Sequence, residues 1–449
     1  MNKITLENFR CFRQKQEARL APLTLLVGEN STGKTSFLAL IRVLWDVAFQ
    51  QVVPDFKDDP YDLGTFDEIA HHRGAKGSRE RKFEVGFSVT QKSQNQIPSP
   101  FDYRFEVEFR KGDTGPTPVR RLFARGDMQI EDLKKGTSPL LKYKKLEREW
   151  SMPVRSSYIR RFLGPENRLH SISYLLWRIL TEEDDARSLA NSDHRPSQQE
   201  LHEVRKIVRR FERVGPRYIG LRPFACAPVR SKPRRTYDPA RLTWDSEGEY
   251  APMYLASVHF QDKPMWLELK ASLENFGRQS GLFDEILVKR FGNNENEPFQ
   301  IQIRKFGGRL KGPPRNLIDV GYGVSQILPV ITELLRHGAP NTFLIQQPEV
   351  HLHPSAQAAL GSLFCELAGT KRQLVVETHS DYLLDRVRMD VRDGKSKLKP
   401  EDVSILYFER KDLEVEIHSL QLDERGRVMD APPSYRKFFM DEVNKRLEL

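Results

Sequence analysis

The sequence predicts an α/β fold with a mostly parallel sheet, in which strands alternate with helices. Three stretches, beginning at residues 23, 342 and 372, share one pattern of a short apolar strand, a polar loop and a helical periodicity. This pattern is typical of parallel sheets, whose ligands bind beyond the carboxyl ends of the strands. We therefore expect the functional residues in the loops that follow these three strands.

The first of these loops fits the phosphate-loop pattern G-x-x-x-x-G-K-[ST]. The sequence GENSTGKT (28–35) separates an apolar run from an apolar helical pattern, and this context disfavours a chance match. Its glycines let backbone N–H groups face a phosphate, and the start of the helix adds partial positive charge. In this pattern Lys34 reaches the outer phosphates of a nucleoside triphosphate, and the Thr35 hydroxyl ligates Mg²⁺. The residues expected to bind the nucleotide here are Gly28, Asn30, Ser31, Gly33, Lys34, Thr35 and Ser36.

Composition limits the class of protein without identifying it. The 449 residues suffice for two parts, and the three cysteines lie too far apart for a disulfide framework or a zinc site. No secretion signal and no run of 18 apolar residues is present, which predicts a soluble, cytoplasmic protein without membrane contact. The net charge of +10 fits nucleic acid, an acidic partner protein or simple solubility equally well.

The middle of the chain differs from its ends. FEVGFSV (83–89) and FDYRFEVEF (101–109) alternate apolar and polar residues and are predicted to pair as strands. Residues 121–215 are basic and mostly helical in spacing, which indicates an insertion. Within it, a helix around 201–211 has one apolar and one basic face. A solvated face on a structural helix is the favoured interpretation, and contact with a polyanion or a partner is the other.

Three further motifs resemble those of the ABC-type ATPase heads of the SMC, RecF and overcoming-lysogenization-defect (OLD) group. IDVGYGVSQIL (318–328) resembles the signature segment, FLIQQPEVHLHP (343–354) the Walker B region, and VVETHSDYLL (375–384) the switch-histidine loop. LENFRCF (6–12) and CAPVRSKPRRTYDP (226–239) also look like OLD-type and related antiphage ATPases. In size and motif content the chain is similar to the ATPase subunits of two-gene antiphage systems of the PARIS or Septu type, which are AAA_15/AAA_21-like.

The resemblance implies a division of the chain. Residues 1–120 would form the first part of an ATPase head with the phosphate loop and an antiparallel β lobe. Residues 121–215 would be the basic helical insertion, residues 216–420 the second part of the head, and residues 421–449 a tail. The fold implied is a P-loop NTPase head of the ABC type.

The resemblance also implies a head-to-head dimer in which ATP lies between the phosphate loop of one chain and the signature segment of the other. Gly323 would let the backbone approach the γ-phosphate, and Ser325 or Gln326 would add a hydrogen bond. Gly321 stands where a serine is usual, so one hydroxyl is missing. His379 would sense the γ-phosphate, an interpretation that we favour over that of a buried core histidine.

The Walker B region departs from the family pattern. An acid that holds Mg²⁺ and a glutamate that positions water are expected where this chain has Gln346 and Gln347. Glutamine is a poor general base, so we expect ATP binding to persist, with Thr35 and Gln346 at the metal, and turnover to be slow. Two carboxylates remain as candidates to compensate. We favour Glu377, whose strand should lie between those of the phosphate loop and Walker B, and expect a structural role for Glu349.

The spacing of His351 and His353 raises the question of a metal site. Zinc needs about four ligands, and no further Cys or His cluster completes the set. A structural or dimer-contact loop is therefore the favoured interpretation.

These features predict a sensor or scaffold ATPase in antiphage defence. No acidic metal cluster of the TOPRIM nuclease type follows the switch loop, so a nuclease effector would be a separate protein, released or activated on a phage-derived trigger. The alternative is a RecF-like or SMC-like repair ATPase whose basic insertion binds DNA. A transporter subunit is disfavoured because the signature segment and the LENF start are of the SMC type.

Overall fold

The chain divides into two compact units. A computed structural model describes residues 1–435 and Lys437, apart from residues 50–53, 75–77, 91–101, 114, 136–137, 147, 154–196, 198, 201, 205, 207–220, 239–242, 293–296, 371 and 436. The first unit comprises Met1–Leu20, Glu29–Pro223 and Phe408–Ser419, and the second comprises Ala21–Gly28, Phe224–Tyr407 and Leu420–Leu449. None of the described helices is long and apolar enough to cross a membrane.

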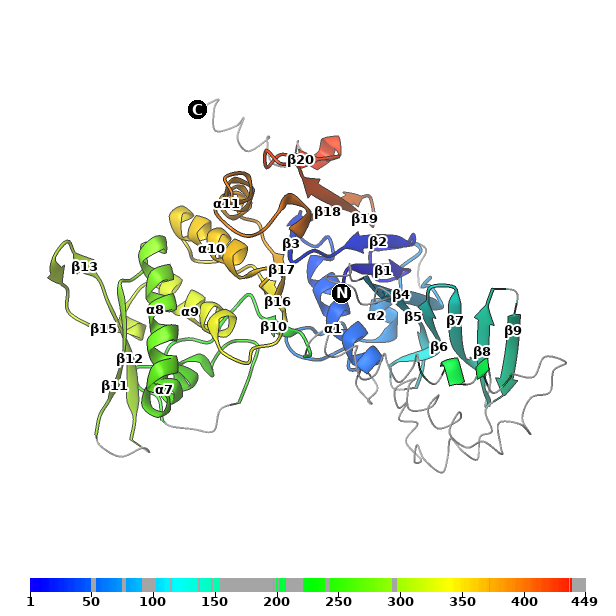
Figure 1. Cartoon of the computed structure of the whole chain (residues 1–449), viewed down its shortest axis with the longest axis horizontal. Coiled ribbons are helices and arrows are strands. Elements are labelled where there is room, and N and C mark those ends of the chain that lie inside the picture. Colours follow the sequence, from blue (N-terminus) through cyan, green and yellow to red (C-terminus); the bar gives the residue numbers. More distant parts are fainter. Residues whose placement is uncertain are drawn as a thin grey trace. The chain divides into compact units, whose positions relative to one another are not determined.

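An antiparallel sheet dominates the first unit (Figure 1), in the strand order β2-β1-β4-β5-β6-β7-β8-β9. Its strands are β1 (Lys3–Glu7), β2 (Gln16–Arg19), β4 (Lys82–Thr90), β5 (Asp102–Lys111), β6 (Pro116–Arg125), β7 (Met128–Lys135), β8 (Ser138–Lys145) and β9 (Arg148–Pro153). Helices α1 (Lys34–Phe49) and α2 (Phe66–Ile69) belong to the same unit. The predicted pairing of β4 with β5 is confirmed.

One face of this sheet is an aromatic core. Phe83 lies opposite Phe109 across β4 and β5, and their rings stack with centroids 5.0 Å apart. Phe56 packs edge-on against Phe109 at 5.3 Å. Side chains alternate along a strand, so the even-numbered residues of β4 and β5 point to the opposite face of the sheet.

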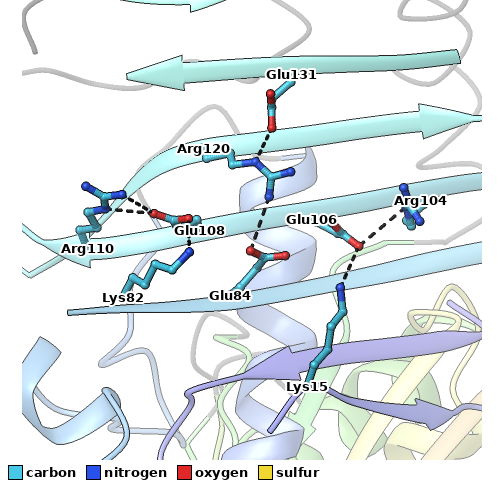
Figure 2. A network of polar contacts seen from close by, with 9 residues as sticks. All are labelled: Lys15, Lys82, Glu84, Arg104, Glu106, Glu108, Arg110, Arg120 and Glu131. Atoms are coloured by element: carbon cyan, nitrogen blue, oxygen red, sulfur yellow. Dashed lines mark hydrogen bonds and ion pairs between the residues drawn. The ribbon is translucent and has the colours of Figure 1, made fainter. Parts of the chain in front are cut away.

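That other face carries a charge network, shown in Figure 2. Its members are Lys15, Lys82, Glu84, Arg104, Glu106, Glu108, Arg110, Arg120 and Glu131. Arg120 on β6 contacts Glu131 of the adjacent strand β7 and Glu84 of β4, which lies two strands away. Burial raises the pKa of Glu108, but hydrogen bonds from Lys82 and Arg110 outweigh it and lower that pKa below its ordinary value. Each cation in the network contacts a carboxylate, so this network offers little uncompensated positive charge to a polyanion.

The expected helical character of residues 121–153 is wrong, because this stretch forms strands β6 to β9. In β8, Lys142 and Lys144 alternate with Leu141 and Tyr143, a period of two that the density of basic residues obscured. Of the helix predicted around 201–211, residues 202–204 and Lys206 are described and helical, and Val204 is fully buried. The basic residues Arg205, Arg209 and Arg210 lie outside the described residues.

The parallel strands of the predicted sheet lie in the second unit. The strand order is β10-β16-β17-β3-β18-β19-β20, and β10, β16, β17 and β3 are parallel neighbours. The strands are β3 (Leu23–Gly28), β10 (Phe224–Cys226), β16 (Thr342–Gln346), β17 (Gln373–Glu377), β18 (Val403–Lys411), β19 (Glu414–Leu422) and β20 (Val428–Met429). The strand that ends at Glu377 lies between those of the phosphate loop and Walker B, which confirms the prediction.

Helices and two small antiparallel sheets, β11-β12-β15 and β13-β14, also belong to the second unit. The helices are α7 (Ala251–Gln261), α8 (Lys263–Ser280), α9 (Tyr322–Leu335), α10 (Pro354–Leu367) and α11 (Asp381–Arg392), with short 3-10 helices η1 (Leu317–Asp319) and η2 (Pro400–Asp402). The remaining strands are β11 (Glu285–Arg290), β12 (Phe299–Arg304), β13 (Phe306–Gly307), β14 (Leu310–Lys311) and β15 (Arg315–Asn316). Helices α10 and α11 lie side by side, and α8 packs against α10 (Figure 1). Apolar side chains from these helices and from β3, β16 and β17 share one core.

Candidate nucleotide site

The phosphate loop follows β3 and leads into α1, as predicted. Gly28, Ser31 and Gly33 have φ angles of 140°, 61° and 85°, and these turns curl the loop. A Cβ atom on Gly33 would lie 2.7 Å from Cys11 Sγ, so both the space and the backbone conformation require glycine there. The Phe37 N–H donates to the Gly33 carbonyl at 2.9 Å and closes the first turn of α1.

Lys34 is held against this loop. It is 3% exposed, and its Nζ donates to the carbonyl of Glu29 at 2.6 Å. The Thr32 hydroxyl donates to the same carbonyl at 2.8 Å. Thus the curled backbone, the ammonium group and the start of α1 supply the donors that a phosphate needs. These residues fit a nucleoside triphosphate.

Two residues outside the phosphate-loop motif brace the loop. The Arg410 guanidinium donates to the Ser31 carbonyl, and Cys11 Sγ lies 3.7 Å from the Thr32 carbonyl. Burial raises the pKa of Cys11 to about 11, so this thiol stays neutral at physiological pH. No sequence motif marks Arg410, which lies some 380 residues further along the chain than Ser31.

The carboxyl ends of three parallel strands meet at one edge of the sheet in the second unit. Gln346, the last residue of β16, is in register with Glu377, the last residue of β17, and Glu377 is in register with Leu26 of β3. Gln346 and Glu377 are both buried. A Walker B glutamine and a carboxylate on the next strand therefore lie beside the strand that leads into the phosphate loop.

The Walker B loop turns sharply after this strand. Gln347 has a φ of 38°, and its N–H donates to the Glu377 carbonyl at 2.8 Å. Glu349 Oε1 accepts the backbone N–H of His379 at 2.7 Å. Burial raises the pKa of Glu349, while that hydrogen bond opposes the rise. This contact supports the structural interpretation of Glu349, whereas the roles of Glu377 and His379 toward a phosphate stay predictions.

The signature segment opens helix α9. Tyr322 is 61% exposed, and its ring lies 5.9 Å from the His351 ring. The Ser325 hydroxyl donates to the Tyr322 carbonyl at 3.0 Å. The side-chain amide of Gln326 forms two hydrogen bonds with the backbone of Arg230, accepting from its N–H and donating to its carbonyl. Both side chains are thus engaged within the chain, and their contact with a γ-phosphate stays a prediction.

Replacing Gly323 by alanine should destabilise the second unit. A Cβ atom there would lie 2.9 Å from the His351 carbonyl oxygen, so the backbone of the Walker B loop must shift, at a cost of about 1–3 kcal/mol. Gly321→Ala is the matched control, because its Cβ would meet nothing within 4 Å. Urea unfolding should show a lower midpoint for Gly323→Ala alone. Equal midpoints for the two variants would contradict the expected clash.

His351 and His353 have separate local partners. His353 Nδ1 lies 2.8 Å from the Ser355 hydroxyl, and His351 packs beside Tyr322. Within the described part of the chain, one group of three residues lies close enough together to hold a metal ion. This group is on β18 and β19 and does not include His351 or His353. Its members are Glu409, Glu416 and His418, and both carboxylates already contact Lys411. The structural or dimer-contact role of the loop that carries His351 and His353 stays a prediction.

A family profile described as "AAA domain, putative AbiEii toxin, Type IV TA system" (AAA_21) matches residues 23–385. The match covers most of the chain, including the phosphate loop, the signature segment, Walker B and the switch loop. This chain belongs to that family of AAA-type P-loop domains.

Solved structures of SMC heads are similar at low sequence identity. The SMC head domain from Thermotoga maritima is 11% identical, over 93% of this chain and 98% of that one, with a TM-score of 0.38. An SMC head bound to the C-terminal domain of ScpA, derived from Pyrococcus furiosus, is 12% identical over 100% of this chain and 98% of that one, with a TM-score of 0.40. An SMC head bound to the C-winged helix domain of ScpA is 11% identical over 94% of this chain and 98% of that one, with a TM-score of 0.41. No curated protein matches the chain.

Proposed function

We propose that this chain is an ATP-binding, slowly hydrolysing ATPase subunit of the ABC type. The observation that supports this most directly is the shared sheet edge, where β3 leads into the phosphate loop and β16 and β17 end at Gln346 and Glu377. Ligands of parallel sheets bind at such an edge. The curled loop and the buried Lys34 fit the phosphates of ATP.

Mg²⁺ would bind together with the nucleotide. The Thr35 hydroxyl and the Gln346 side-chain oxygen are the residues that would hold it, and when bound it neutralises charge on the outer phosphates. Gln346 contributes a neutral oxygen where an acid is usual, so most of the metal's oxygen ligands would come from phosphates and water. Affinity for Mg²⁺ should therefore depend strongly on bound nucleotide.

Slow turnover follows from the chemistry of the same edge. Gln347 stands where a glutamate usually positions water, and its amide cannot accept a proton at neutral pH. Glu377 is then the carboxylate at this edge that remains to orient or deprotonate the attacking water. Long-lived ATP states would suit a protein whose output depends on holding a conformation.

Replacing Glu377 by glutamine should lower ATP turnover about 100-fold, the usual contribution of a positioned general base. The affinity for ATP should change little, because the phosphate loop is intact. Steady-state hydrolysis and nucleotide titration measure the two quantities. Glu349→Gln is the comparison variant, and its turnover should fall less. If Glu349→Gln were inactive and Glu377→Gln active, the roles assigned to the two carboxylates would be reversed.

We further propose that the ATP-bound chain assembles with a second copy and acts as a sensor or scaffold in antiphage defence. The AbiEii description of the family supports a defence setting. Ile318 and Tyr322 on the signature segment are exposed, which suits a face that meets a partner. A separate effector, a nuclease in the simplest case, would be held and then released or activated on a phage-derived trigger.

Copurification tests this role. The wild-type chain, expressed with the product of its neighbouring gene, should elute as a complex in ATP, and the complex should dissociate on addition of a phage protein. Light scattering should show self-association that requires ATP. A monomer in saturating ATP, without a bound effector, would refute the scaffold proposal.

A RecF-like DNA-binding function has less support. The net charge of +10 fits DNA binding, but it fits an acidic partner protein or simple solubility equally well. The charged face of the β lobe is internally paired (Figure 2).

A further inference from the structure

Arg230 is buried beside the Walker B strand. It is 2% exposed, and its Nη2 donates to the carbonyl of Gln346 at 3.0 Å. Its backbone N–H donates to Gln326 Oε1 at 3.1 Å, and its carbonyl accepts from Gln326 Nε2 at 3.4 Å. One residue thus joins the first turns of the signature helix α9 to the end of β16.

Burying the charged side chain of Arg230 in the core costs folding free energy. Two further donors of the guanidinium, Nε and Nη1, have no hydrogen-bond partner among the described residues. A buried cation costs several kcal/mol unless it is well paired. Glu349 is the carboxylate whose ionisation Arg230 favours, but no hydrogen bond joins the two side chains within the described structure. An apolar residue would fill this space at less cost, so stability alone does not explain the arginine.

Glu349 extends the contacts to the switch loop. Its Oε1 accepts the N–H of His379 at 2.7 Å. The next residue, Ser380, caps helix α11 by accepting the Leu383 N–H at 3.0 Å and donates its hydroxyl hydrogen to Gln357 at 2.5 Å. The position of the His379 backbone is therefore fixed by Glu349 on one side and by the start of α11 on the other.

We propose that Arg230 is a positioning residue that links the signature segment to the switch loop within one chain. It holds Gln326 and the Gln346 carbonyl in one arrangement. The Walker B loop runs from Gln346 to Glu349, which accepts the His379 N–H, so fixing the start of this loop also places His379. The functional part of this inference rests on the proposed function, in which the signature segment meets the nucleotide of a second copy and His379 meets the chain's own. A nucleotide bound at the signature segment would then favour the binding geometry of the switch loop, and a nucleotide bound at the switch loop would favour that of the signature segment.

Hydrogen exchange in the nucleotide-free protein tests the link directly. Arg230→Met should raise amide exchange in residues 377–383 roughly tenfold, because the Walker B loop that carries Glu349 loses its hydrogen bond at the Gln346 carbonyl. Arg230→Lys keeps a cationic donor for that carbonyl and should restore part of the protection. Arg234→Met is the matched control, since Arg234 lies in the same loop but is exposed and pairs with Glu249. Wild-type exchange in a folded Arg230→Met would overturn the proposal.

Turnover and binding test the functional consequence. Arg230→Met and Gln326→Ala should each lower ATP turnover roughly tenfold and leave ATP affinity within about twofold, and the double variant should be no worse than Arg230→Met because both break one link. Additive losses, or a loss of affinity equal to the loss of turnover, would show that Arg230 is only a structural brace. If the wild type does not bind ATP at all, the proposed function fails, while the exchange experiment still decides whether Arg230 positions the switch loop.

Discussion

Lys34→Ala should abolish function by weakening nucleotide binding. The ammonium group lies on the phosphate loop, 2.6 Å from the Glu29 carbonyl, where charge-assisted hydrogen bonds to the outer phosphates are expected. Losing them should weaken ATP affinity by about 100-fold, equivalent to about 2.7 kcal/mol. Titration with a fluorescent ATP analogue measures the change.

A control separates binding from folding in that experiment. Lys3→Ala removes a lysine of the same unit that pairs with Glu17 on the surface, and it should bind ATP like the wild type. Both variants should melt within a few degrees of the wild type when no nucleotide is present. Undiminished ATP affinity in a folded Lys34→Ala would refute the assignment of the loop as the nucleotide site.

Arg222→Met should give the largest loss of stability. Arg222 donates to both carboxylate oxygens of Asp46, at 2.8 and 2.7 Å, and contacts Asp58 at 2.6 Å. Asp46 is 4% exposed on helix α1, so the substitution would leave a buried carboxylate without this partner. Breaking such a pair costs about 3–5 kcal/mol, measured as a fall in the free energy of unfolding in urea.

Two further variants show whether the loss of stability in Arg222→Met comes from the unpaired charge of Asp46. Arg235→Met breaks an exposed pair with Asp319 and should cause no measurable change. Arg222→Met combined with Asp46→Asn removes the unpaired charge and should recover part of the lost stability. A double variant as unstable as Arg222→Met alone would show that the lost packing of Arg222, and not the charge of Asp46, dominates.

The parallel sheet was predictable because its signals are local. A short apolar strand, a polar loop and a helical periodicity recur at Gly28, Gln346 and Glu377, and parallel pairing brings such ends to one edge. The eight-stranded antiparallel sheet of the first unit was harder to predict from the sequence. The strands from 116 to 153 have many charged residues that hide their period of two, so the residue spacing predicts helices for most of the stretch.

The supporting residues of the site could not be predicted from the sequence. Arg230 contacts Gln326 and Gln346, which lie 96 and 116 residues away along the chain. Arg222 contacts Asp46 across 176 residues. Such contacts depend on how side chains meet after folding, and neither composition nor periodicity reports them.

The bond between Lys34 and the Glu29 carbonyl sets a condition on the ligand. The ammonium group has three hydrogens, and the Glu29 carbonyl accepts one of them, which sets the position of the Lys34 side chain along the loop. A polyphosphate that follows the curled backbone would meet loop N–H groups and this ammonium together, whereas inorganic phosphate would reach fewer of them. We therefore expect longer phosphate chains to bind more tightly than short anions.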